Sequence, residues 1–310
     1  MIKQASSMSG LLEENGIMEK IMTYHQEGTL KGAGGVKLYY QSWHPQGNVR
    51  AVLALVHGLG AHGSAFGNII DYFIPKNYAV YSFDLRGHGR SQGQRGYINH
   101  WGEFREDLGT FLQFIQTQES GCPCFLLGHS MGALIVVDYA LRSPEQASTL
   151  QGIIALAPAL GKVGIPPLKL AIGRLLSRVW PRFTLSTGID LTVASRDPAV
   201  LADYAQDALR HNRGSARLAT EYLATVDWIQ EHAEDWQLPL LILHGGADQV
   251  TLPEGGSAFF QKVAIQDKER REYPEVYHEI HNDLNYQDVL ADMDNWLEQH
   301  LPVKPSATNC

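Results

Sequence analysis

The sequence contains few cysteines and offers no disulfide framework. Three of its 310 residues are cysteines. Cys122 and Cys124 stand on either side of Pro123, a spacing that differs from the paired CxxC pattern of a zinc site. We predict that both are buried strand residues that behave as small apolar side chains. The cysteine content therefore indicates neither a disulfide scaffold nor a structural metal site.

Long apolar segments are also absent. Runs such as Ala51–Val56 and Leu240–Leu243 are far shorter than the ~18 apolar residues that a membrane-spanning helix requires. The N-terminal segment carries Glu13, Glu14 and Lys20 and has no uninterrupted apolar stretch, which argues against a signal peptide. A cytoplasmic location is the default expectation.

Basic residues are in the minority. The 25 Lys and Arg residues against 33 Asp and Glu give a formal net charge of -8. This is the wrong sign for binding a phosphate backbone, so we expect no nucleic-acid partner. The content of 44% hydrophobic and 19% charged residues is ordinary for a globular enzyme and does not indicate disorder.

Strand and helix patterns alternate along most of the chain. The alternation at Val36–Tyr40, after a Gly-rich turn at Gly32–Gly35, predicts an N-terminal antiparallel hairpin. Continuous apolar runs then predict strands buried on both faces, at residues 51–56, 79–83, 125–127, 153–157 and 240–243. Segments with helical periodicity lie between them, as at Phe104–Ile115 and Leu134–Leu141. The predicted class is α/β, with a mostly parallel, doubly wound sheet.

One stretch interrupts this alternation. Residues 159–236 contain several helical patterns separated by prolines, which predicts a helical cap, or lid, inserted into the core. The expected division is 1–158 and 237–302 for the two parts of the core, with 303–310 as a flexible tail. The first helix of the cap, Leu168–Trp180, is apolar around most of its circumference. Either it packs on its neighbours, or it meets lipid or lines an acyl tunnel.

The most informative motif is Gly128-His129-Ser130-Met131-Gly132. It follows a predicted strand and precedes a predicted helix, which is the context of a G-x-S-x-G nucleophile elbow. We expect the flanking glycines to let the chain turn sharply, so that the Ser130 hydroxyl projects above the sheet near the helix N-terminus. Ser130 is therefore the candidate nucleophile.

A serine hydroxyl needs a base to remove its proton and an acid to orient that base. In elbow-type hydrolases the three residues occur in the order Ser, Asp or Glu, then His, each after a strand. Asp248 follows the predicted strand at 240–243, and His278 follows a probable last strand around Arg271–Tyr273. Asp248 is the candidate acid and His278 the candidate base.

Two nearby side chains are alternatives for these roles. His281 lies shortly after His278 and is the main alternative base. Asp283 is the less favoured alternative to Asp248. Because the chain has 13 histidines, one histidine at a suitable position is a weak signal by itself.

Hydrolysis also needs two donors for the oxyanion of the tetrahedral intermediate. We expect one to be the backbone N–H of Met131, directly after the nucleophile. The other is expected from the segment His57–Gly60, which follows the strand at 51–56 and whose glycines keep the backbone accessible. The N–H of Leu59 is the candidate, and His57 is expected to be structural.

Several segments jointly resemble a known family. They are His57–His62, Phe83–Ser91, Gly128–Ala133, His244–Asp248 and Tyr277–His281, and within the insertion Arg196–Pro198 and Tyr204–His211. With these segments the chain resembles, over roughly residues 24–301, the monoacylglycerol lipase and lysophospholipase branch of the α/β-hydrolases, which are serine hydrolases.

The resemblance implies an α/β-hydrolase fold and cleavage of carboxylic esters of lipid type, with no cofactor and no metal. Its nucleophile, acid and base fall on Ser130, Asp248 and His278, and its oxyanion donors on Leu59 and Met131. It also implies a small-molecule lipid ester as substrate, an apolar acyl tunnel beneath the cap, and peripheral membrane contact through the cap.

Other functions remain open. A general carboxylesterase, a thioesterase or an acyltransferase uses the same triad, and the same fold can also serve as a non-catalytic binding protein. A dinucleotide-binding oxidoreductase is an alternative from another class. Gly58–Gly63 matches G-x-G-x-x-G after a strand, and Asp84 ends the next strand.

Overall fold

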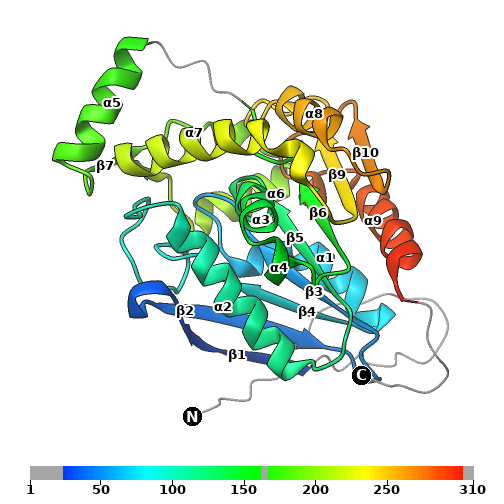
Figure 1. Cartoon of the computed structure of the whole chain (residues 1–310). Helices are drawn as coiled ribbons and strands as arrows, with labels where there is room; N and C mark the ends of the chain where they lie inside the picture. The colour runs from blue at the N-terminus through cyan, green and yellow to red at the C-terminus, as the bar shows by residue number, and fades with distance from the viewer. Residues whose placement is uncertain (1–23, 162–166, 303–310) are drawn as a thin grey trace.

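Within residues 24–161 and 167–302, which a computed structural model of the chain describes, an eight-stranded sheet forms the centre of the protein (Figure 1). Its strand order is β1-β2-β4-β3-β5-β6-β9-β10. β1 and β2 form an antiparallel hairpin, β2 runs antiparallel to β4, and the other neighbours are parallel. The strands are β1 (Tyr24–Lys31), β2 (Lys37–His44), β3 (Ala51–Val56), β4 (Tyr78–Phe83), β5 (Cys124–His129), β6 (Gly152–Leu156), β9 (Leu240–Gly245) and β10 (Lys268–Tyr273). The predicted parallel sheet and N-terminal hairpin are confirmed.

β3 shows why the central strands are continuously apolar. Val52, Ala54 and Val56 belong to the hydrophobic core on one side of the sheet. Ala51, Leu53 and Leu55 belong to the core on the other side. Successive side chains of a strand point to opposite faces, so a strand covered on both faces needs apolar residues at every position.

Helices cover both faces. Side chains of α2, α3, α7 and α8 contribute to the first core, and those of α1 and α9 to the second. The helices outside the insertion are α1 (Gly67–Phe73), α2 (Gly102–Gln118), α3 (Met131–Arg142), α4 (Pro144–Ala147), α8 (Pro253–Lys262) and α9 (Tyr286–His300). Short 3-10 turns lie at Ala33–Gly35, Gly63–Phe66, Ile74–Lys76, Leu191–Val193, Ala233–Asp235 and Ile280–Asn282.

The chain leaves the sheet after β6 and re-enters it at β9, and β6 and β9 are paired neighbours. We call the intervening residues 159–236 the insertion. Its described part holds α5 (Pro167–Val179), α6 (Pro198–Gln206), α7 (Ala216–Glu231) and the antiparallel ribbon β7 (Thr184–Ser186) and β8 (Arg213–Ser215). The predicted tail at 303–310 lies outside the described residues.

α5 packs on the insertion with one side only. Ser177 of α5 is hydrogen-bonded to Thr220 of α7, at 2.9 Å. Four apolar side chains repeat at helical spacing away from that contact and are exposed: Leu168, Ile172, Leu175 and Val179. Figure 1 shows α5 at the outer end of the insertion, away from the sheet. The prediction that α5 packs on its neighbours is therefore wrong for the face that carries these four side chains.

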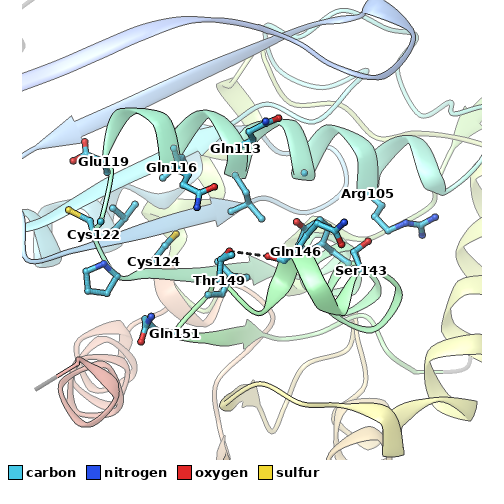
Figure 2. Close-up of a pocket in the computed structure, with 18 of the residues that line it drawn as sticks. Arg105, Gln113, Gln116, Glu119, Cys122, Cys124, Ser143, Gln146, Thr149 and Gln151 are labelled. Atoms are coloured by element: carbon cyan, nitrogen blue, oxygen red, sulfur yellow. Dashed lines mark hydrogen bonds between the residues drawn. The ribbon is translucent and has the colours of Figure 1, made fainter.

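A groove lies at the amino end of β5, opposite the end that carries the elbow. It measures about 780 Å³ and runs between α2, α4 and the start of β5 (Figure 2). Cys122 and Cys124 line it, and both are half-buried, with Cys122 lying before β5 begins. The prediction of two buried strand cysteines is thus wrong for Cys122 in position and for both in burial. Since α/β folds place their sites at the carboxyl ends of the strands, this groove is not the candidate active site.

The helices of the described residues are each too short or too polar to cross a bilayer.

Candidate active site

The serine elbow joins β5 to α3. Ser130 has φ 57° and ψ -121°, a left-handed conformation that is rare for a residue with a side chain and that accumulates at functional sites. The flanking glycines do not have positive φ. A Cβ at Gly132 would lie 2.1 Å from Val56 O, and one at Gly128 would lie 2.5 Å from Gly132 O. Ser130 has the positive φ, and the flanking glycines let the chain turn sharply because they leave room for β5 and β3 to approach α3.

Asp248 and His278 come together although 30 residues separate them. The Asp248 Oδ2 lies 2.8 Å from the His278 Nδ1. Both side chains are buried, and each follows a strand, Asp248 after β9 and His278 after β10. The pairing orients the imidazole so that its Nε2 is left for another partner.

The carboxylate of Asp248 is held ionised by its hydrogen bonds. Its Oδ1 accepts from the backbone N–H of Val250 at 2.7 Å and of Thr251 at 2.9 Å. Burial raises the pKa of Asp248, but hydrogen bonds from His244 and His278 and from Thr251 outweigh it and hold the pKa well below its usual range. An ionised acid beside His278 stabilises the positive form of the imidazole.

Ser130 and His278 line one pocket, together with Gly58, Leu59 and His129. Within the described residues no hydrogen bond joins the Ser130 hydroxyl to the His278 ring. In structures without substrate such a bond is often long and closes only in the complex. The structure thus pairs Asp248 directly with His278. It places Ser130 in the same pocket as His278, without a hydrogen bond between the two side chains.

The loop after β3 lies against the serine. A Cβ at Gly58 would lie 2.9 Å from the Ser130 Cβ and 3.4 Å from its Oγ, so the backbone of this loop passes directly beside the hydroxyl. Gly60 has φ 75° and its carbonyl accepts from the N–H of His211 at 3.0 Å, which ties the loop to the insertion. Neither the N–H of Leu59 nor that of Met131 donates to another described residue. Both donors are therefore available to a ligand oxygen.

His57 holds this loop in place and is neutral. Its Nε2 accepts from the N–H of Leu85 at 2.9 Å, so its Nδ1 is the protonated nitrogen that donates to the carbonyl of Gly58 at 2.8 Å. Burial lowers the pKa of His57 well below its ordinary value. A buried, neutral imidazole with both nitrogens occupied is structural, as the sequence predicts.

The alternative base and acid are occupied elsewhere. His281 is buried, its ring lies tilted against that of Phe66, and its Nε2 is 3.6 Å from a Glu279 oxygen. Burial lowers the pKa of His281 to about 4. Asp283 forms an ion pair with Arg196 of the insertion at 2.8 Å. Neither side chain is paired with a partner that would make it the base or the acid for Ser130.

The dinucleotide alternative does not fit the glycine-rich loop. Asp84, which would bind the ribose, has both oxygens occupied by backbone N–H groups, of Gly63 and Arg90, each at 2.7 Å. A Cβ at Gly60 would lie 2.0 Å from the carbonyl oxygen of His211, so the insertion covers the place that a pyrophosphate needs. The match to G-x-G-x-x-G is local and lacks the open space that dinucleotide binding requires.

Sequence reasoning missed Thr251. Its hydroxyl lies 2.8 Å from Asp248 Oδ2 and 3.1 Å from His278 Nδ1, and it can donate to the carbonyl of Ala157 at 3.0 Å. It therefore braces both members of the pair. The available signal was its position three residues after an Asp that follows a strand, a spacing at which the backbone and side chain of a turn residue can hydrogen-bond to the carboxylate.

His129, Glu279 and His281 are grouped closely enough to be potential metal ligands, with their donor atoms within 4.8 Å of one another. All three are buried beside the pocket. The Nε2 of His129 lies 3.2 Å from the carbonyl oxygen of His278 and can donate to it. His129 therefore also supports the loop that carries His278.

Comparison with known proteins relates the whole arrangement to a family. Residues 47–285 match the hydrolase family described as serine aminopeptidase, S33. A monoacylglycerol lipase of Mycolicibacterium smegmatis is 30% identical over 283 residues, which cover 91% of this chain and 100% of that protein.

Solved structures agree. The monoacylglycerol lipase of Paleococcus ferrophilus is 33% identical, with a TM-score of 0.75 over 85% of this chain and 99% of that one. A soluble variant of the monoglyceride lipase of Saccharomyces cerevisiae, in complex with a substrate analog, is 25% identical, with a TM-score of 0.79 over 88% of this chain and 95% of that one. The similarity spans both the sheet and the insertion.

Proposed function

Because this chain belongs to the α/β-hydrolase family described as serine aminopeptidase, S33, we propose that it hydrolyses carboxylic esters of lipids through an acyl-enzyme on Ser130. The relatives named above are lipases of monoacylglycerol, which favours esters of the monoacylglycerol or lysophospholipid type. The observation that carries the proposal is the 2.8 Å contact of Asp248 with His278, whose side chain lines the same pocket as Ser130.

In the proposed mechanism His278 removes the proton from Ser130 as the hydroxyl attacks the ester carbonyl. Asp248 stabilises the imidazolium, and the N–H groups of Leu59 and Met131 bind the oxyanion. His278 then gives the proton to the leaving alcohol. A water molecule, activated by the same imidazole, attacks the acyl-enzyme and releases the fatty acid.

The proposal has two tests. A fluorophosphonate should label the folded protein covalently, and a substrate panel should rank the esters by kcat/KM. The panel holds a monoacylglycerol, a lysophospholipid, an acyl thioester, a short aryl ester and an aminoacyl amide. We expect the lipid esters to exceed the thioester and the amide by at least about tenfold. If the protein is neither labelled nor active on any substrate, it is a non-catalytic binding protein. If the thioester or the amide has the highest kcat/KM, the protein is a thioesterase or an amidase and the proposed reaction is wrong.

We further propose that residues 159–236 act as a cap over the two core segments 1–158 and 237–302, and that α5 brings the cap into contact with a lipid surface. Leu168 and Val179, at the two ends of its apolar face, are 72% and 67% exposed, and Trp180 beyond it is 58% exposed. A monomeric protein rarely exposes such a contiguous apolar face without a use for it. A helix with this pattern lies in the plane of a membrane interface.

Replacing Ile172 and Leu175 together by glutamine should weaken binding to phosphatidylcholine vesicles by roughly 10- to 100-fold. The variant transfers two fewer apolar side chains from water into the lipid when it binds. Co-sedimentation with the vesicles measures the effect. Leu284→Gln is the matched control, since Leu284 is also exposed, at 56%, but lies outside the insertion. Equal binding by the double variant and the control would contradict the membrane role of α5.

A further inference from the structure

The loop that carries His278 is closed by one buried carboxylate. This loop follows β10 and contains the 3-10 turn Ile280–Asn282. The side chain of Asp283 is buried, and its Oδ2 accepts a hydrogen bond from the backbone N–H of Tyr277 at 3.0 Å. Tyr277 directly precedes His278. Asp283 therefore holds the backbone on one side of the proposed base.

Arg196 of the insertion holds this carboxylate in turn. Arg196 lies between the 3-10 turn Leu191–Val193 and α6. Its Nε donates to the Asp283 Oδ1 at 2.8 Å, and its Nη2 donates to the side-chain oxygen of Asn285, also at 2.8 Å. A planar guanidinium that donates from two of its nitrogens has a defined orientation toward its acceptors. The ion pair therefore fixes the position of the insertion relative to the loop.

The two residues just before that arginine hold the other side of the base. The carbonyl of Ala194 accepts from the N–H of Glu279 at 2.8 Å, and Glu279 directly follows His278. The hydroxyl of Ser195 donates to the carbonyl of Asn282 at 3.0 Å. Ala194 and Ser195 are both buried, so these hydrogen bonds are shielded from competing water. The insertion is thus bonded to the loop on both sides of the histidine.

We propose that Arg196 and Asp283 are positioning residues, which hold the loop of His278 where the imidazole reaches the Ser130 hydroxyl. This inference rests on the proposed ester hydrolysis. The contact with Asp248 orients the imidazole, but the backbone of the loop decides how far the ring lies from the serine. A displacement of about 1 Å at a reacting group can cost about 10²-fold in rate. The ion pair thereby acts on acylation, although neither of its residues lines the pocket.

A second ion pair of the chain offers a matched control. Arg105 of α2 also pairs with a buried carboxylate, that of Asp138 in α3, at 2.7 Å. Asp138 keeps Arg142 as another partner at 2.8 Å, so Arg105→Met is expected to fold. Both Arg105→Met and Arg196→Met remove a cation from a buried carboxylate, but Arg105 makes no bond to the loop of the base. A purely structural ion pair would change stability alone, as the control should.

The test measures acylation apart from folding. The rate of the pre-steady-state burst with a chromogenic short aryl ester is followed well below the thermal midpoint of each variant. Arg196→Met and Asp283→Asn should each lower the burst rate by roughly 10- to 100-fold, while the ester concentration for half-maximal burst rate stays nearly unchanged. The double variant should be about as slow as either single one, because both remove one interaction. Arg196→Lys should acylate faster than Arg196→Met, since it keeps a charged donor, and Arg105→Met should keep the wild-type rate.

The outcomes separate this inference from the proposed function. A wild-type burst rate in Arg196→Met, or an equal loss of rate in Arg105→Met, overturns the positioning role while the ester hydrolase stands. Slow acylation in Asp283→Asn alone also overturns it, because Asp283 would then act on the base without the insertion. If Arg196→Met does not fold, a wild-type burst rate in both Asp283→Asn and Arg196→Lys overturns it. A wild-type protein that gives no burst and is not labelled by a fluorophosphonate overturns the ester hydrolase and the positioning role together.

Discussion

Ser130→Ala is expected to lower kcat for the preferred ester by about 10⁴- to 10⁶-fold, because the serine, the imidazole and the carboxylate act as a unit and the nucleophile has no substitute. The thermal midpoint should change little, since alanine keeps the Cβ and removes only a hydroxyl that makes no structural hydrogen bond to His278. Steady-state turnover and thermal unfolding measure the two quantities.

The matched control for this variant is Ser148→Ala. Ser148 lies at the end of α4 and is exposed, and within the described part of the chain its hydroxyl donates only to the carbonyl of Glu145. Its loss should leave kcat as it is. Near-normal turnover by Ser130→Ala, with the control unchanged, would show that another group is the nucleophile.

His278→Ala is expected to abolish formation of the acyl-enzyme, with a loss of about 10⁴-fold or more in the acylation rate. Of His278 and His281, His278 is the one whose Nδ1 is paired with Asp248, so its ring is oriented and its positive form is stabilised. His281→Ala should retain acylation but unfold at a lower temperature, because it removes a partner from buried Glu279 and a ring from Phe66.

The measurement is the pre-steady-state burst with a chromogenic aryl ester, read beside the thermal midpoint of each variant. The two readouts separate a catalytic defect from a packing defect. A burst that persists in His278→Ala and disappears in His281→Ala would show that His281 is the base. The contact of Asp248 with His278 would then be structural.

Much of the fold follows from local patterns. Central strands such as β3 are recognisable because burial on both faces demands apolar residues throughout. β10 is harder to recognise, since it is an edge strand with the polar sequence Lys268–Tyr273 and one neighbour, β9. A strand around Arg271–Tyr273 is expected from the chain order, and the structure begins it earlier, at Lys268. Edge strands carry charged side chains that hide their periodicity.

The candidate serine, acid and base are predicted from residue types, from their order along the chain and from the family resemblance. Other features of the site and of the insertion depend on side chains that become neighbours only in the folded protein. Three features depend on segments far away in sequence: Thr251 braces the pair, the buried Nη2 of Arg210 has no acceptor among the described residues, and apolar side chains on one face of α5 are exposed. A side chain's type sets which bonds it can form, but whether those bonds are already formed within the protein depends on what the fold packs around it.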